Sequence, residues 1–235
     1  MGREVKKEMS ASIPLRDRLA GLGLYLYSRL IYRTSRYRVR GQEHLEEAWA
    51  QGQSVVWATW HGMTMMVSGY VLDLLNQRSD YRMALIVPAD WRGNTLSTWA
   101  RHIGIEPHAV NHHSAALSQA RGVVQVLRAM RQGADCYINP DGPDGPPYVV
   151  KPGVVFIAQK TGGRLVPIGA FTATKYTLKR WDRYSVPLPF SRIAIVFGEP
   201  VPAPRDGDRG AIAQALTTAL HQAAADAERL YTERV

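Results

Sequence analysis

Apolar segments of strand length alternate along the chain with segments that have the spacing of amphipathic helices. Strands are expected at residues 53–60, 83–88, 104–110, 134–139, 164–174 and 192–197. Helices are expected at residues 63–75, 94–102, 114–132, 153–161 and 208–232. Such alternation is typical of a sheet whose strands run mainly parallel and whose faces are covered by helices. We therefore expect an α/β fold, with a mainly parallel or mixed central sheet flanked by helices.

The helix expected at residues 114–132 has the clearest pattern. Ser114 can cap its start, and its apolar residues share one face: Leu117, Ala120, Val123, Val124, Leu127 and Met130. Gly133 follows as the left-handed residue that commonly ends a helix. The helix at residues 94–102 is expected to be capped by Asn94 or Thr95.

Basic residues are concentrated at the start of the chain. Residues 1–40 contribute +7 to a formal net charge of +9. This excess points to an anionic partner, either nucleic acid or a membrane surface. We expect no nucleic-acid partner, because no interleaving of aromatic and basic residues and no known binding motif follows.

Residues 19–28 are apolar and aromatic, and Arg18 and Arg29 bracket them. The segment is shorter than the ~20 residues that a helix needs to span a bilayer. It suits an N-terminal amphipathic helix in the lipid headgroup region, and it equally suits a first helix packed against the core. The total length of 235 residues fits one large domain. We expect a membrane-associating segment at residues 1–34 and an α/β domain at residues 35–235.

The single cysteine, Cys136, cannot form an intramolecular disulfide, which fits a reducing cytoplasmic environment. Its apolar neighbours favour an inert thiol in the core over a nucleophile. The adjacent His112 and His113 point in opposite directions at a strand end, which makes them poor metal ligands. His102 and His108 complete no recognisable metal spacing, so we expect no metal site.

Sites in open parallel sheets form in the loops beyond the carboxyl ends of the strands. By that rule the candidate loops are residues 61–62, 89–93, 111–114 and 140–147. His61 directly follows the first buried strand, and Gly62 permits a sharp turn into the next helix. An imidazole, with an ordinary pKa of ~6.5, can take a proton from an alcohol at neutral pH. His61 is therefore a candidate base, with a capping or core histidine as the alternative.

The loop at residues 140–147 alternates prolines with two Asp-Gly pairs. Both features fix turns, so the loop is expected to be stiff. A stiff loop suits a site that holds a carboxylate and backbone N–H groups in place. A tight surface turn is the alternative.

Several motifs in a fixed order carry a resemblance to a known superfamily. They are Trp60-His61-Gly62, residues 140–146, Lys151-Pro152-Gly153-Val154, Arg180-Trp181-Asp182-Arg183, Pro187-Leu188-Pro189-Phe190-Ser191 and Phe197-Gly198-Glu199-Pro200. Over residues 35–202 the chain resembles the lysophospholipid-acyltransferase-like superfamily of glycerolipid acyltransferases. Within it, the chain is most similar to an uncharacterised bacterial branch.

The resemblance implies an O-acyltransferase of lipid metabolism, such as phospholipid biosynthesis. It implies transfer of a fatty acyl group from acyl-coenzyme A or acyl carrier protein to a hydroxyl of a lysophospholipid or lipid-linked sugar, with no further cofactor. His61 is then the general base, the loop at residues 140–147 holds the acceptor headgroup, and N–H groups near Gly62 or Gly142 stabilise the oxyanion. The implied location is peripheral, at the cytoplasmic face of the inner membrane, with an anionic membrane surface as partner.

The chain departs from the superfamily pattern around the candidate base. Met66 stands where an aspartate normally orients the catalytic histidine. Asp141 or Asp90 is therefore expected to supply the carboxylate from a neighbouring loop, as a remote carboxylate does in a catalytic triad. The loop after the third strand also reads Asn111-His112-His113 in place of the usual arginine-bearing sequence.

A further departure is Asp144, at a position where the branch usually has arginine. A carboxylate there repels a phosphate that a guanidinium would bind. A phosphorylated acceptor then needs another base, such as Arg92, Lys151 or Arg121, and a less anionic acceptor is the simpler alternative.

The predicted catalytic residues are His61 and Asp141. The predicted substrate-binding residues are Trp60, Gly62, Asp90, Arg92, Pro140, Gly142, Pro143 and Lys151. Because the departures fall on polar positions of the expected site, a second function stays open: a non-catalytic lipid-binding or assembly protein on the same fold.

Overall fold

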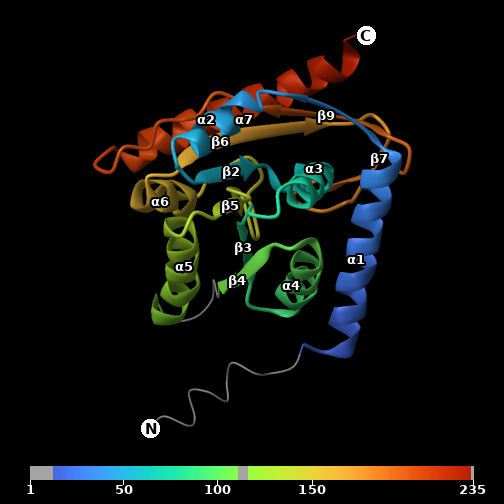
Figure 1. Ribbon diagram of the computed structural model, residues 1–235, viewed down its shortest axis with the longest axis horizontal. Helices are drawn as coiled ribbons and strands as arrows, with labels where there is room; N and C mark the ends of the chain where they lie inside the picture. The colour runs from blue at the N-terminus through green and yellow to red at the C-terminus, as the bar shows by residue number, and fades with distance from the viewer. Residues whose placement is uncertain (1–12, 111–115, 234–235) are drawn as a thin grey trace.

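A seven-stranded sheet forms the centre of the protein, as Figure 1 shows for the computed structural model, which describes residues 13–110 and 116–233. The strand order is β1-β9-β6-β2-β5-β3-β4. The strands are β1 (Arg36–Arg40), β2 (Val55–Thr59), β3 (Met83–Pro88), β4 (Glu106–Val110), β5 (Asp135–Ile138), β6 (Arg164–Phe171) and β9 (Arg192–Phe197). Within this sheet, paired strands run parallel except β6 and β9. The predicted α/β fold with a mainly parallel sheet flanked by helices is confirmed.

Helices pack on both faces of this sheet (Figure 1). Among the described residues they are α1 (Leu15–Thr34), α2 (Glu43–Ala50), α3 (Thr64–Gln77), α4 (Trp91–Ile103), α5 (Ala116–Arg131), α6 (Pro152–Thr161) and α7 (Arg209–Thr232), with a 3-10 turn, η2 (His61–Met63). α1 to α4 contribute to one hydrophobic cluster, and α5 to α7 contribute to another. A small separate pair of strands, β7 (Lys175–Thr177) and β8 (Ser185–Pro187), lies between β6 and β9 in the chain.

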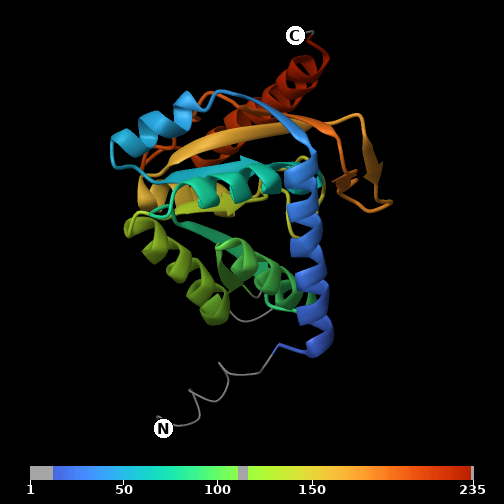
Figure 2. The ribbon, with the colours of Figure 1, turned by 45° about the vertical axis from the view of Figure 1, so that its right-hand side comes forward.

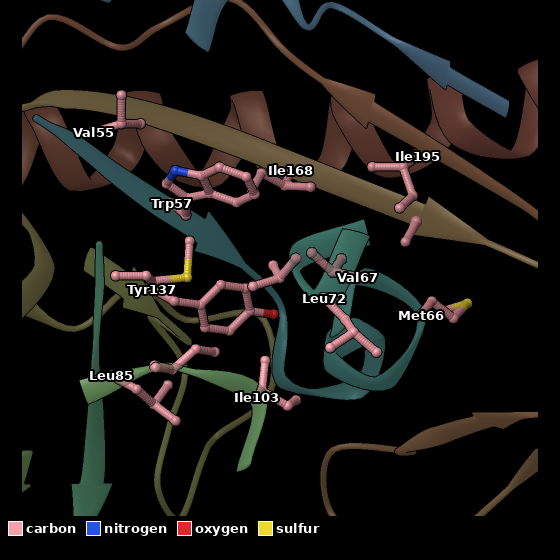
Figure 3. Close-up of a cluster of buried hydrophobic side chains, with 14 of the residues drawn as sticks. Val55, Trp57, Met66, Val67, Leu72, Leu85, Ile103, Tyr137, Ile168 and Ile195 are labelled. Carbon is pink, nitrogen blue, oxygen red and sulfur yellow. The ribbon is translucent and has the colours of Figure 1, made fainter. Parts of the chain in front are cut away.

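β2 is buried along its whole length. Val55 and Trp57 belong to the cluster that includes α1 to α4, whereas Val56 and Ala58 belong to the cluster that includes α5 to α7. Figure 3 shows Trp57 of β2 beside Ile168 of β6 within the first cluster. A central parallel strand is covered on both faces, which explains why this run is apolar without polar alternation.

Helix α4 begins at Trp91, so the predicted start at Asn94 and the predicted caps were wrong. Asp90 is the cap: its carboxylate accepts hydrogen bonds from the N–H groups of Arg92 at 2.9 Å and Gly93 at 3.2 Å. Gly93 also lets this first turn approach β3, since a Cβ there would lie 1.6 Å from the Pro88 carbonyl oxygen. The apolar spacing that marks the helix in the sequence begins only after this capped turn.

The sequence pattern does not reveal β1 or α2. β1 reads Arg-Tyr-Arg-Val-Arg, which looks like an exposed segment. It is nevertheless the edge strand of the sheet, paired parallel to β9. Its arginines stay near solvent, where Arg40 binds Glu233 at 2.8 Å.

The core-facing side of α5 agrees with the prediction at Val123, Leu127 and Met130, which pack in the cluster that includes α5 to α7, but not at Val124. Val124 is 58 % exposed, whereas Val126 is buried. Gly133 ends this region with the predicted positive φ, +87°. The predicted cap Ser114 and the residues Asn111, His112 and His113 lie outside the described residues.

Cys136 is buried in the core, as predicted. Burial raises the pKa of its thiol well above the ordinary value, which disfavours the reactive thiolate. No partner thiol exists in the chain, because this is the single cysteine.

Helix α1 packs against the domain on one face and is exposed on the other. One face packs against the domain: a Cβ on Gly21 would lie 2.5 Å from Thr98 Cβ of α4, and Trp99 of α4 donates to Ser28 Oγ at 3.0 Å. The opposite face carries leucines that remain exposed. Figure 2 shows α1 along one edge of the molecule. Across residues 13–110 and 116–233, no helix is both long and apolar enough to cross a membrane.

A buried carboxylate ties β5 to the strand beside it. Asp135 accepts hydrogen bonds from Val55 N–H at 2.7 Å, Tyr81 O–H at 2.7 Å, and the indole N–H groups of Trp49 and Trp57 at 3.0 Å each. These donors come from β2, α2 and the segment before β3. The carboxylate therefore satisfies several polar groups that would otherwise be buried without a partner.

We predict that Asp135→Ala lowers the free energy of unfolding by about 3 kcal/mol or more, because it strands these buried donors. Urea denaturation followed by circular dichroism measures the change. The matched control is Asp80→Ala, at a side chain that is 80 % exposed and 3.9 Å from Arg78. The control should change stability by no more than about 0.5 kcal/mol. Equal effects of the two substitutions would contradict the assignment.

Candidate active site

His61 lies at the carboxyl end of β2, in the first position of η2. Its side chain is 23 % exposed. Nδ1 is buried and has no hydrogen-bond partner among the described residues. The exposed part of the imidazole therefore excludes Nδ1.

Asp141 lies behind this buried nitrogen. Its carboxylate is 2 % exposed, and Oδ1 is 4.0 Å from His61 Nδ1. The same oxygen accepts a hydrogen bond from the His61 backbone N–H at 3.1 Å, and Oδ2 accepts one from Tyr148 N–H at 3.3 Å. The backbone bonds fix the carboxylate where it faces Nδ1. Of the two carboxylates predicted to support His61, the structure brings Asp141 to the ring.

Strand pairing explains why these two residues meet. β2 and β5 are parallel neighbours, with Ala58 opposite Ile138, so the segments that follow them emerge at the same edge of the sheet. Asn139 joins the two segments: its Nδ2 donates to Thr59 O and to Thr64 Oγ1, each at 2.9 Å.

Glycines let the backbone approach His61 closely. A Cβ on Gly142 would lie 2.7 Å from both Cε1 and Nδ1 of the His61 ring. A Cβ on Gly62 would lie 2.5 Å from the Asp182 carbonyl oxygen. Both positions are therefore restricted to glycine by contact with the site, not by turn geometry alone.

The segment at residues 178–184 completes the site, and its role was missed in the sequence analysis. The Trp181 ring lies edge-on to the His61 ring, with 5.3 Å between centroids. Asp182 has a fully buried side chain that accepts from Arg180 at 3.1 Å and from Tyr184 N–H at 3.3 Å. The sequence held one indication of this role: Trp181 and Asp182 belong to the motif Arg180-Trp181-Asp182-Arg183, which is part of the family resemblance.

Burial sets the protonation state of the pair. The pKa of His61 lies below its ordinary value because burial disfavours the imidazolium, although the carboxylates of Asp141 and Asp182 act in the opposite direction. The charges of Arg180 and Lys151 lower it further. Burial likewise raises the pKa of the Asp141 carboxyl, against the hydrogen bonds that it accepts. His61 is therefore neutral at physiological pH, the state that a general base requires.

Asp90 takes a different role from the one predicted for it. It caps α4 and binds the Arg92 guanidinium at 2.7 Å. Arg92 also reaches Asp144 of the 140–147 loop, at 3.0 Å. Two carboxylates thus hold Arg92, which links α4 to the loop and is not available as a free cation.

Trp60 and Met66, two further residues considered in the sequence, are both buried. Trp60 is 1 % exposed, and its ring packs against the rings of Tyr148 and His221. Met66 is also buried in the core, so the position at which an aspartate was expected holds an apolar side chain and supplies no carboxylate to His61. Figure 3 shows Met66 in the cluster around α3.

Pro140 is buried, and its carbonyl oxygen accepts a hydrogen bond from Lys151 N–H at 2.9 Å. Pro143 follows Gly142 through a cis peptide bond and is half-buried. Within the described part of the chain, no group of His, Cys, Asp and Glu side chains has the arrangement of a metal site.

No known family model matches the sequence. The chain is 31 % identical, over 179 residues, to an uncharacterised protein of Rickettsia prowazekii (strain Madrid E). The alignment covers 76 % of this chain and 78 % of the Rickettsia protein. The chain therefore belongs to the same protein family as that protein.

We predict that His61 titrates below 6.5, its ordinary value, in an NMR titration of the ring Cε1–H resonance. Asp141→Asn should lower this pKa further, because the Asp141 carboxylate favours the charged ring. Asp80→Asn, on the exposed surface, should leave it unchanged. A His61 pKa that rises on Asp141→Asn would contradict the arrangement.

Proposed function

We propose that the protein is an O-acyltransferase in which His61 is the general base. It moves a fatty acyl group from acyl-coenzyme A or acyl carrier protein to a hydroxyl of a lysophospholipid or lipid-linked sugar. The observation that carries the proposal is a partly exposed, neutral His61 with the buried Asp141 carboxylate behind it, at the carboxyl end of a parallel sheet. The sequence resemblance to lysophospholipid acyltransferases supports this substrate class.

In the proposed reaction, the neutral imidazole takes the proton of the acceptor hydroxyl as that oxygen attacks the thioester carbonyl carbon. A carbon–oxygen bond forms, and the carbon–sulfur bond then breaks. The imidazolium returns the proton to the departing thiolate. Asp141, 4.0 Å from Nδ1, stabilises the transient positive charge.

The oxyanion of the tetrahedral intermediate needs an N–H donor. The N–H of Gly142 already donates to the Asn139 carbonyl oxygen at 3.1 Å. The N–H of Gly62 lies in the first turn of η2, where helical N–H groups have no acceptor within the helix. Gly62 is therefore the better donor of the two.

Lys151 is the cation best suited to an anionic group on either substrate. Its positive charge lowers the pKa of His61, and its backbone N–H donates to the carbonyl oxygen of Pro140, at the start of the 140–147 loop, at 2.9 Å. It forms no ion pair with another residue of the described chain, whereas Asp90 and Asp144 hold Arg92. An ammonium without a carboxylate partner is free to bind a phosphate.

A lipid acceptor implies a location at the cytoplasmic face of the inner membrane, with the protein bound peripherally. The basic N-terminal segment supports this location, since residues 1–40 carry +7 of the net charge of +9. Anionic lipids at the membrane surface attract such segments.

A second candidate function is a non-catalytic lipid-binding or assembly protein. Two observations favour it: Met66 fills the expected carboxylate position with a core side chain, and Asp141 lies beyond hydrogen-bond distance of Nδ1. This second function predicts that the protein binds lipid but releases no coenzyme A from acyl-coenzyme A with any lipid acceptor of a panel.

We predict that His61→Ala lowers the rate of acceptor-dependent coenzyme A release by about 100-fold to 10,000-fold, the usual contribution of a general base. His44→Ala is the control, because His44 pairs with Glu199 away from the site, at 3.7 Å. Thermal unfolding should give similar midpoints for both variants and the wild type. Activity that survives in folded His61→Ala would refute the proposed role.

We further predict that Gly142→Ala lowers the rate by about 100-fold, because the added Cβ would displace the His61 ring from its position. The matched control is Gly153→Ala, where a Cβ meets nothing within 4 Å. The two variants should differ strongly in turnover number. Equal activities would show that the position of the ring does not limit the reaction.

A further inference from the structure

Helix α1 carries an exposed row of leucines along its outer face. Leu15, Leu19, Leu22, Leu26 and Leu30 are 36 to 68 % exposed. At 3.6 residues per turn they fall within an arc of ~80°, opposite the face that packs on α4. A folded protein rarely leaves so continuous an apolar row without a partner. We call these five residues the leucine row.

Arginines border the leucine row and remain available for an anionic partner. Arg18 and Arg29 lie along one border, and Arg33 lies near its C-terminal end. None of the three forms an ion pair with another described residue. An exposed apolar row with basic borders is typical of helices that lie in the plane of a lipid headgroup layer.

A hollow beside the row has a lining suited to a phosphate. It has a volume of about 200 Å³ and is lined by Tyr25, Arg29, Tyr32, Arg33, Leu72 and Asn76. Arg29 donates to the Tyr25 hydroxyl at 3.2 Å, which holds its guanidinium at the rim. The nearby Asp73 is already engaged by the Tyr32 hydroxyl.

Phe190, an exposed apolar residue between β8 and β9, lies beside the C-terminal end of α1. Phe190 is 80 % exposed, and its φ of +65° is unfavourable for a bulky side chain. Its N–H donates to Thr34 Oγ1 at 3.2 Å, and the Tyr27 hydroxyl donates to the Pro187 carbonyl oxygen at 2.7 Å. Figure 2 shows the β7–β8 pair beside this end of α1.

We propose that α1 lies flat on an anionic phospholipid surface, with the leucine row and Phe190 in the acyl boundary and Arg29 and Arg33 on lipid phosphates. A second copy of the chain fits less well. Two copies packed through this row would bring their bordering arginines together without carboxylates between them.

This docking mode brings the active site to the surface that supplies a lipid. Trp181, which contacts His61, and Phe190 belong to the same excursion between β6 and β9. α4, whose first turn carries Arg92 beside the 140–147 loop, packs along α1, where Asn94 donates to Asp17 at 3.1 Å. Delivery of a lipid acceptor rests on the proposed function, whereas membrane binding itself does not.

Co-sedimentation with vesicles tests the surface without turnover. Wild type and His61→Ala should bind vesicles of phosphatidylcholine and phosphatidylglycerol equally well. The double substitution Leu19→Ser and Leu26→Ser should weaken that binding at least about tenfold. Val124→Ser, at an exposed valine of α5, is the matched control and should bind as wild type does.

Arg29→Gln with Arg33→Gln should reduce the preference for these vesicles over vesicles of phosphatidylcholine alone, because two of the basic residues of the segment are lost. Phe190→Ser, in a separate segment, should weaken binding in the same direction as the leucine variant. Unchanged binding of a folded leucine variant would overturn the proposal. So would a wild-type dimer in analytical ultracentrifugation that the leucine substitutions dissociate, together with no binding to either vesicle.

Discussion

The parallel pairing of β2 with β5 is the constraint on which the site depends. Burial of β2 on both faces fixes the strand in the middle of the sheet, and Asp135 ties its start to β5 through Val55 N–H. Because the two strands run in the same direction, His61 and the 140–147 loop emerge at one edge. Asn139 then fastens the loop to Thr59 and Thr64. The position of Asp141 behind the imidazole follows from this pairing and not from any local sequence spacing.

Close backbone packing around His61 lowers the pKa of its imidazole and keeps the ring neutral. Gly142 lies against the imidazole, and Gly62 lies against the Asp182 carbonyl oxygen. This packing buries Nδ1 and lowers the pKa of the ring, while a neighbouring carboxylate remains close enough to stabilise a transient charge. A neutral base with a buried counter-charge is suited to proton transfer from an alcohol. The proposed acyl transfer rests on this neutral base together with the sequence resemblance to acyltransferases, and Met66, buried in the core, contributes no carboxylate to the site.

The sequence predicts the central strands and the position of His61 after a strand end, because both depend on strong local patterns. The apolar run at residues 53–60 has no polar interruption, and the loop at residues 140–147 is rich in turn residues. β1 was missed because an edge strand can carry arginines. Asp90 was one of two candidate carboxylates for His61, but it caps α4 and binds Arg92, a role that depends on where the helix starts. Asp182 reaches the site through a long excursion, which no spacing rule anticipates. The leucine row shows the same limit, since its pattern fits burial and membrane contact equally until the packed face of α1 is known.

The most direct test of the central claim is the fate of the acyl group. The protein, bound to vesicles that contain candidate lipid acceptors, is given acyl-coenzyme A with an isotopically labelled acyl chain, and the lipids are analysed by mass spectrometry. If His61 is the general base of an acyltransferase, the wild type should give a labelled lipid ester and His61→Ala should give none above background. Label recovered only as free fatty acid, or an equal yield of labelled ester from the folded His61→Ala protein, would contradict this role.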